Sequence, residues 1–217
     1  MEKVKFDRTK AHQKYTLKSG EEVKGATTIL SVINKPALLD WAWKMGRSGK
    51  DYKAVRDKAG GIGTLLHFLA ECHVKHLEPD ISEFSESEIK TATPLFDKFK
   101  KWWEENGFVL VGSEVQLVSE RFKYGGTLDI VATKPNGRLT LIDLKTGKSC
   151  YKDYWYQVAG YEQLWGENNP SNPILDKIIL RFDKESGDIY PTEKSDLQLY
   201  LQVFNSALVL YKVLQAV

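Results

Sequence analysis

The chain has 217 residues, of which 42% are hydrophobic and 28% are charged. This balance is ordinary for a folded globular protein and argues against a disordered chain. The 31 basic and 29 acidic side chains leave a net charge of +2, so a phosphate-binding surface must come from local clustering of charge. No apolar run approaches the ~18 residues of a membrane span, and we expect no association with a membrane.

Cys72 and Cys150 are the only cysteines of the sequence. Two thiolates are too few for a four-cysteine zinc or iron–sulfur site, so we expect no iron–sulfur cluster. They also provide no disulfide framework, and the charged start Met1–Lys5 lacks the apolar core of a signal peptide. These features predict a cytoplasmic protein.

The N-terminal segment predicts short strands followed by two helices. We expect the strands within the first ~25 residues, around the turn at Lys18–Glu21. Thr27 or Thr28 is the expected cap of a helix through Val32. Pro36 suits the first turn of a second helix, over residues 37–45.

Glycines punctuate the next part of the chain. We interpret Gly60–Gly63 as a bend, with Thr64 capping the helix that follows through Cys72. A further helix is expected over Ser87–Asn106 and is closed by Gly107, because glycine favours the position just after a helix.

The second half of the chain changes to the period of strands. The expected strands are Phe108–Val118, Thr127–Thr133, Leu139–Leu144, Ile174–Phe182 and Asp188–Tyr190, and the expected helices are Tyr151–Trp165 and Lys194–Val217. This order predicts an α/β fold of mixed α+β type in a single domain. Residues 1–107 would form its N-terminal strands and mostly helical part, and residues 108–217 its sheet core and closing helix.

An acid and a lysine lie side by side at the end of one predicted strand. Period-2 alternation places Asp143 and Lys145 on the same face. The segment Pro135–Gly137 is a strong turn signal, and a hairpin symmetric about Asn136 places Asp129 directly opposite Asp143. Directly opposed side chains have Cβ atoms ~4.5–5.5 Å apart. A bulge at Gly137 would shift this register by one residue.

Two carboxylates this close repel each other, and a divalent cation between them would remove the conflict. Hard oxygen ligands of this kind suit Mg²⁺ or Mn²⁺. The alternative is a pair of ordinary strand-end acids, Asp129 and Asp143, with Lys145 as their ion-pair partner.

Three polar side chains could complete such a site. Gln157 and Tyr161 share one face of the next helix, where an amide and a phenol can bind phosphate oxygens or orient a lysine. The alternative for both is a polar stripe beside the core. His67 could supply an imidazole ligand, although a histidine on such a helix is more often structural.

Basic and aromatic residues alternate near the start of that helix. Lys148, Tyr151 and Lys152 are accompanied by Tyr154, Trp155 and Tyr156. Such a mixture can neutralise the phosphates and stack the bases of a single strand. The alternative is that the aromatic rings pack in the core and the lysines are solvated.

These motifs resemble the RecB-type exonuclease branch of the PD-(D/E)xK nuclease superfamily. They occur in the order Gly63-x-x-x-His67, Gly126–Asp129, Ile142–Gly147 and Gln157-x-x-x-Tyr161. The segment Gly25–Leu30 is similar to the opening of phage-encoded and mitochondrial-maintenance exonucleases of this branch. The resemblance runs from about residue 25 to residue 165.

The resemblance implies a restriction-endonuclease-like core, with a central mixed sheet flanked by helices and an N-terminal helical region. It also implies roles for single residues. The metal ligands would be His67, Asp129, Asp143 and the backbone carbonyl of Leu144. Lys145 would position or deprotonate the attacking water, and Gln157 and Tyr161 would hold the phosphate and the lysine. Glu114 occupies a position at which many relatives carry an acid, and we rank it as a weaker candidate for a catalytic residue.

The implied function is a Mg²⁺- or Mn²⁺-dependent DNA exonuclease. The resemblance places it in phage or bacterial recombination, repair or replication, in a bacterial or phage-infected cell. Its substrate would be single-stranded DNA or DNA with free ends, with a recombination or replication protein as a partner. The alternatives are a structure-specific endonuclease on the same core, a catalytically decayed nucleic-acid-binding protein and an ion-paired structural domain. The intact Asp129, Asp143 and Lys145 argue against decay.

Overall fold

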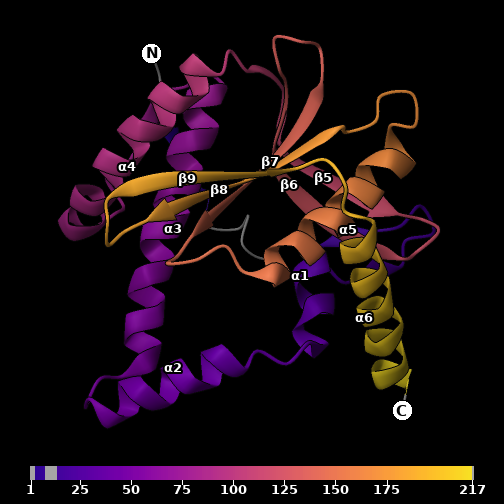
Figure 1. Ribbon diagram of the computed structural model, residues 1–217, viewed down its shortest axis with the longest axis horizontal. Helices are drawn as coiled ribbons and strands as arrows, with labels where there is room; N and C mark the ends of the chain where they lie inside the picture. Colours follow the sequence, from indigo (N-terminus) through magenta and orange to yellow (C-terminus); the bar gives the residue numbers. More distant parts are fainter. Residues whose placement is uncertain (1–2, 8–13, 217) are drawn as a thin grey trace.

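A five-stranded sheet forms the centre of the computed structural model, which describes residues 3–7 and 14–216 (Figure 1). The strands follow the order of the sequence: β5 (Val109–Ser119), β6 (Tyr124–Thr133), β7 (Leu139–Thr146), β8 (Asp176–Asp183) and β9 (Asp188–Lys194). Neighbouring strands are antiparallel except β7 and β8, which are parallel and are joined by α5 (Lys152–Asn168). The predicted mixed α/β fold is therefore confirmed.

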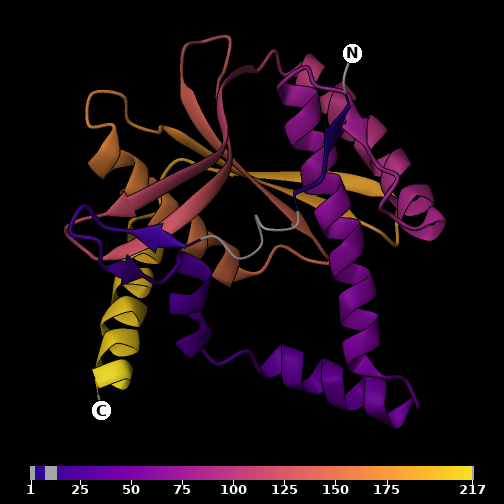
Figure 2. The same cartoon turned by 180° about the vertical axis from the view of Figure 1, so that it is seen from behind.

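Helices cover both faces of the sheet (Figures 1 and 2). Helices α3 (Tyr52–Val74) and α4 (Glu86–Glu105) pack on one face, and α1 (Ala26–Ile29), α5 and α6 (Gln198–Ala216) pack on the other. Leu141 and Ile142 are neighbours in β7 and are both fully buried, but each belongs to a different core. A strand covered on both faces reads as a continuous apolar run, and in β7 the charged residues that depart from that pattern, Asp143 and Lys145, lie toward its end.

Short strands occupy the N-terminal segment, as predicted. Strand β1 (Val4–Lys5) pairs with β4 (Pro79–Asp80), and β2 (Tyr15–Thr16) forms a hairpin with β3 (Glu22–Val23). Residues 8–13 of the predicted strand segment lie outside the described residues. The turn between β2 and β3 contains Gly20 at φ 87°, a conformation that glycine adopts without strain.

The expected cap at Thr27 or Thr28 is wrong, because the cap of α1 lies two to three residues earlier. Its N-cap is Gly25, which makes no side-chain cap, and the helix continues into the 3₁₀ turn η2 (Leu30–Val32). Gly25 forms a bridge to Gly125, and the Gly125 amide donates to the Lys24 carbonyl at 3.0 Å. Pairing with a distant strand therefore fixes where this helix starts.

The predicted bend at Gly60–Gly63 is also wrong, because α3 runs through these glycines without interruption. Its N-cap is Asp51, whose carboxylate accepts the Lys53 amide at 2.8 Å, so Thr64 lies in the helix interior. Two of the glycines, Gly61 and Gly63, make room for neighbouring elements. A Cβ on Gly61 would lie 1.9 Å from Glu88 Oε1, and one on Gly63 would lie 2.8 Å from Thr146 Oγ1.

The remaining helices agree with the sequence pattern except at the start of α6. The sequence predicts this helix from Lys194, but β9 extends to Lys194 through its pairing with β8, and α6 begins at Gln198. Helix α2 spans Pro36–Arg47, with proline in its first turn. Helix α4 starts with a capping box between Ser85 and Glu88 and is followed by Gly107 at φ 60°. The predicted end of the closing helix at Val217 lies outside the described residues. Among the residues that are described, no helix combines the length and apolar character needed to cross a bilayer.

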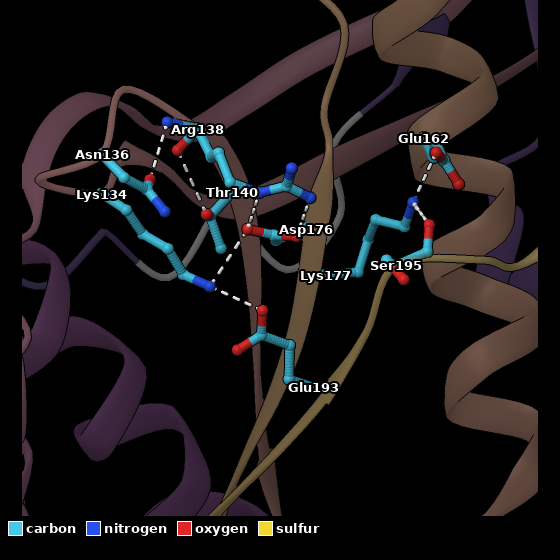
Figure 3. Close-up of polar contacts among 9 residues, drawn as sticks. All are labelled: Lys134, Asn136, Arg138, Thr140, Glu162, Asp176, Lys177, Glu193 and Ser195. Atoms are coloured by element: carbon cyan, nitrogen blue, oxygen red, sulfur yellow. Dashed lines mark hydrogen bonds and ion pairs between the residues drawn. The ribbon is translucent and has the colours of Figure 1, made fainter.

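Charged residues at the start of β7 and β8 form a satisfied network (Figure 3). Asp176 accepts two hydrogen bonds from Arg138, at 2.8 and 2.6 Å, and one from Lys134 at 3.1 Å. Beside it, the buried Lys177 donates to Glu162 Oε1 at 2.7 Å and to the Ser195 carbonyl at 2.8 Å. This network holds the β6–β7 turn against β8, at the end of the sheet away from Asp143 and Lys145.

Candidate active site

The register of β6 and β7 brings Asp129 opposite Asp143. The hydrogen-bonded pairs run from Thr133 opposite Leu139 to Ile130 opposite Ile142, so the predicted register is confirmed and the turn at Gly137 does not shift it. Asp129 lies one position beyond the last of these pairs. Its Oδ2 accepts the backbone amide of Leu144 at 2.7 Å, which fixes the carboxylate against the end of β7.

Three possible metal ligands converge at this end of the sheet. His67 from α3, Glu114 from β5 and Asp129 from β6 each offer a ligand atom, and these atoms lie within 4.8 Å of one another. His67 Nδ1 lies 3.7 Å from Asp129 Oδ1. One imidazole and two carboxylates are a donor set that suits a divalent cation such as Mg²⁺ or Mn²⁺. We call these three residues the donor cluster.

Glu114 enters the donor cluster through an unusual backbone conformation. Its neighbours Ser113 and Val115 pair with Ile130 and Leu128, so Glu114 stands opposite Asp129. Its φ is 51°, in the left-handed region that a residue with a side chain adopts at a cost of about 1–2 kcal/mol. The sequence carries no sign of this conformation, which explains why pattern alone ranks Glu114 below the other acids.

Asp143 and Lys145 form a buried ion pair beside the donor cluster. Asp143 Oδ2 lies 2.7 Å from Lys145 Nζ, and the Asp143 side chain is 1% exposed. Apart from this ion pair, neither carboxylate oxygen has a hydrogen-bond partner in the part of the chain that the structure describes. Burial and, to a lesser extent, the charge of Asp129 together raise the pKa of Asp143 to about 6, against the opposing effect of Lys145. The donor cluster does not include Asp143.

Lys145 remains a cation in this setting. Burial lowers the pKa of its amine, but the charges of Asp143 and Asp129 outweigh burial and raise the pKa above its ordinary value. Its Nζ also lies 5.6 Å from the centre of the Tyr154 ring. A protonated lysine can stabilise developing negative charge or position a water, but it cannot accept that water's proton.

Gln157 and Tyr161 interact with each other on the inner face of α5. Gln157 Nε2 donates to the Tyr161 hydroxyl at 2.5 Å. Burial raises the pKa of Tyr161 well above its ordinary value, and the charges of Asp143 and Asp129 add to this effect. The phenol is therefore neutral. Its ring lies against Gly126, where a Cβ would be 2.7 Å from Tyr161 Cε1.

The residues predicted to contact substrate lie on the loop after β7 and at the start of α5. Lys148 is exposed and pairs with Glu185 at 2.6 Å. Tyr151 is 45% exposed, and its ring meets that of Tyr154 edge to face with 5.6 Å between the centroids. Lys152 is exposed at the first position of α5. Their contact with substrate remains a prediction.

A polar pocket beside Glu114 could not be predicted from the sequence. It has a volume of about 310 Å³ and is lined by the β2–β3 hairpin together with Thr27, Thr28 and Thr127. Tyr15 anchors the hairpin, because its ring fills the space beside Gly125 and its hydroxyl hydrogen-bonds to Thr127 Oγ1 at 2.9 Å. Tyr15 lies in a two-residue strand, too short to show a periodic pattern.

Arg181 is a second residue that sequence reasoning missed. It pairs with Lys145 in the parallel register of β7 and β8. Its guanidinium donates to the Gly147 carbonyl and to Asp183, both at 2.8 Å, and lies over the Tyr190 ring. These contacts hold the turn that follows Lys145. Nothing in the local sequence around Arg181 shows that a parallel strand places it there.

The chain is similar in structure to several solved proteins. A protein of Eubacterium rectale, described as a candidate exonuclease, gives a TM-score of 0.46 at 12% identity, over 70% of this chain and 66% of that protein. The alkaline exonuclease LHK-Exo from Laribacter hongkongensis gives a TM-score of 0.30 at 10% identity, over 73% of this chain and 89% of that one. A complex of LHK-Exo with dAMP gives 0.35 at 8% identity, over 72% and 84%. No family model and no curated protein sequence matches the chain. These solved structures include proteins that are described as exonucleases.

Proposed function

We propose that this chain is a metal-dependent DNA exonuclease whose residues act together as one nuclease domain. The observation that carries the proposal is the donor cluster of His67, Glu114 and Asp129 beside the buried pair of Asp143 and Lys145. An isolated ion pair would explain Lys145 and Asp143 alone. It would not explain why two more acids and a histidine from three other elements face the same point.

The donor cluster fits a hard divalent cation. Asp143 Oδ1 has no hydrogen-bond partner among the described residues, and Oδ2 has only the ion pair with Lys145, so the protein groups do not fully satisfy this buried carboxylate. His67, Glu114 and Asp129 would hold the ion, and Asp143 would add negative charge beside it. When bound, such an ion supplies positive charge for phosphoryl oxygens and lowers the pKa of a coordinated water.

The protein side chains supply the remaining chemistry of phosphodiester hydrolysis. Lys145, held protonated by Asp143, places a positive charge where the transition state gains negative charge. Gln157 and Tyr161 offer neutral donors that can hold a phosphate without changing the charge of the site. The amide of Leu144 keeps the Asp129 carboxylate in place.

The role of the enzyme belongs to the same proposal. We infer action on DNA with free ends or on single strands, in phage or bacterial recombination, repair or replication, with a recombination or replication protein as partner. The sequence resemblance supports these points. Lys148, Tyr151 and Lys152 are the proposed contacts to the strand, because all three are exposed, so the two ammonium groups can meet phosphates and the ring can stack on a nucleobase.

Digestion of end-labelled linear and circular DNA, single- and double-stranded, tests the proposal. The reactions contain Mg²⁺, Mn²⁺ or EDTA. We expect loss of linear but not circular DNA that depends on metal and falls about a hundredfold or more in Lys145→Ala. Lys101→Ala is the matched control, because Lys101 is exposed on α4 and pairs only loosely with Glu105, at 3.7 Å.

Other outcomes would select the alternatives. Cutting of circles would indicate an endonuclease on the same core. DNA binding without cleavage under any metal, with Lys145→Ala indistinguishable from wild type, would indicate a binding protein on a decayed nuclease core.

A further inference from the structure

The outer face of α6 carries an apolar stripe that the rest of the described chain leaves exposed. Its large members are Leu199, Val203, Leu210 and Val213, which are 74%, 36%, 47% and 55% exposed. The opposite face of the helix, with Phe204, Ala207 and Leu208, is buried in the core. The buried face therefore accounts for the packing of α6 in the fold, and the exposed apolar face makes no contribution to that packing. We call Leu199, Val203, Ser206, Leu210 and Val213 the α6 seam.

The spacing of the α6 seam is that of a helix–helix contact. Its residues follow one another at intervals of four, three, four and three positions. This repeat keeps one line of side chains facing a partner helix along its whole length, as in coiled coils. Val209 and Leu214, which are 62% and 52% exposed, flank the line on either side.

The α6 seam can be buried without leaving a polar group unpaired. Its one hydroxyl, Ser206 Oγ, donates to the Gln202 carbonyl at 2.8 Å within the same helix. Lys212 is the sole charged residue of α6, and its Nζ donates to the Phe122 carbonyl at 2.8 Å, toward its own chain. Covering the seam therefore buries no uncompensated charge, which would otherwise oppose association.

The seam also matches itself. In two antiparallel helices related by a twofold axis at Ser206, Leu199 of each copy faces Val213 of the other, and Val203 faces the region of Val209 and Leu210. Large apolar residues meet large apolar residues at both ends, and the small Ser206 meets its own copy where the helices come closest. Antiparallel packing also aligns the helix dipoles favourably. A twofold contact needs such self-complementarity.

We propose that the α6 seam is a dimer interface, on which a second copy of this chain packs its own α6 antiparallel across Ser206. In both views α6 lies at the edge of the molecule, outside α5, so another copy can reach it (Figures 1 and 2). The donor cluster lies on α3, β5 and β6, so the dimer does not depend on the proposed nuclease activity. A single pair of helices is a small interface, and we expect dissociation in the micromolar range.

Sedimentation of the full chain over about 1–100 μM tests the dimer. We expect a shift from the 24.7 kDa of one chain to twice that mass as concentration rises. Val203→Glu or Leu210→Lys alone should weaken the dimer by at least about a hundredfold, because each buries a charge without a partner. Gln215→Glu, an exposed change on another face of α6, is the control.

A charge pair tests the antiparallel arrangement. Val203→Glu combined with Leu210→Lys should restore dimers, because each new acid faces a new base of the other copy. A parallel pair would place like charges together, so failure of this rescue would overturn the antiparallel geometry. A chain that is monomeric throughout the range, or a dimer that ignores Val203→Glu, would overturn the interface itself.

Crosslinking provides a readout that needs no charge in the seam. Ser206→Cys, a change of one atom, should give a covalent dimer with a short thiol crosslinker, whereas Ser186→Cys on the β8–β9 turn should not. This variant keeps the test valid if Val203→Glu fails to fold. Equal yields for both variants would contradict the proposed axis at Ser206.

Discussion

Glu114 owes its position to the fold and not to its local sequence. Residues with φ near 50° are uncommon outside glycine and asparagine, and they persist where surrounding structure holds them. Here the ladder on either side of Glu114 holds it opposite Asp129. The same strand residue in a regular β conformation would point its side chain in another direction. The strained backbone is therefore an argument that Glu114 serves the site.

Thermal unfolding with and without Mn²⁺ measures whether the donor cluster binds metal. An ion that binds only the folded chain at 100 times its Kd adds about 2.7 kcal/mol. At ~2–4 °C per kcal/mol for a chain of this size, the Tm should rise by about 5–10 °C. Asp129→Ala should abolish this rise and Glu114→Gln should reduce it, because each removes a ligand.

Asp97→Ala is the matched control for this measurement. Asp97 is an exposed acid of α4 that pairs with Lys100 at 2.8 Å. A metal-dependent rise in Tm that survives in Asp129→Ala would show that the ion binds elsewhere.

Asp176 should make stability depend on pH. The hydrogen bond from Arg138 lowers its pKa from 3.8 to about 2, and Lys134 acts in the same direction. Because the folded pKa is the lower one, the stabilisation is full above about pH 4 and is lost as the pH falls from 3.8 toward 2. The difference corresponds to about 2 kcal/mol.

Urea unfolding of Asp176→Asn measures this effect. At pH 6 the variant should be less stable than wild type by about 2 kcal/mol, and this gap should narrow by about half at pH 3. Asp97→Asn, in an exposed pair, should show no such narrowing. A gap that stays constant from pH 6 to pH 3 would mean that protonation of Asp176 does not contribute.

At the scale of elements, the glycines of α3 show where sequence patterns mislead. Three glycines within four residues usually indicate a bend, because glycine weakens a helix. For two of them the reason lies in other elements: the Glu88 side chain of α4 crosses over Gly61, and Thr146 of β7 lies against Gly63. The start of α1 was mispredicted for a similar reason. Its true cap, Gly25, is fixed by a β-bridge to Gly125, which is distant in the sequence. Contacts between distant segments leave no periodic signal.

Two alanine substitutions in α3 separate helix propensity from packing. Gly60 has nothing within 4 Å of an added Cβ, so Gly60→Ala should stabilise the protein by about 0.5–1 kcal/mol. Gly63→Ala gains the same helix propensity, but its new Cβ would lie 2.8 Å from Oγ1 of Thr146, the residue that follows Lys145. We expect it to destabilise in urea unfolding and to lower nuclease activity. Equal stabilities for the two variants would show that the α3–β7 contact is loose.

For the whole molecule, local patterns predicted the sheet and the placement of part of the candidate site. The turn signal at Pro135–Gly137 predicted the register of β6 and β7, which is correct because short hairpins leave little choice of pairing. The positions of Asp129 and Asp143 follow from that register alone. The positions of Glu114, Tyr15 and Arg181 depend on strand conformation, a distant hairpin and a parallel crossover. None of these three could be inferred from neighbours in the sequence.

The free energy of local unfolding should differ between elements, and we expect it to be among the lowest in α2. None of its described side chains is buried, and Leu38, Leu39 and Trp43 are 55%, 67% and 60% exposed. In both views α2 lies apart from the sheet, whereas α5 packs directly on it (Figures 1 and 2). A helix without a buried face is stabilised mainly by its own hydrogen bonds, so it opens at little cost.

Hydrogen exchange followed by mass spectrometry measures this difference in the free protein. Amides of α2 should exchange on the order of a hundredfold faster than those of α5, which corresponds to ~2.7 kcal/mol in opening free energy. Gly60→Ala, which stabilises α3, should leave the exchange of α2 unchanged, because α2 opens independently of the core. Protection of α2 equal to that of α5 would mean that α2 unfolds only with the core, despite its exposed side chains.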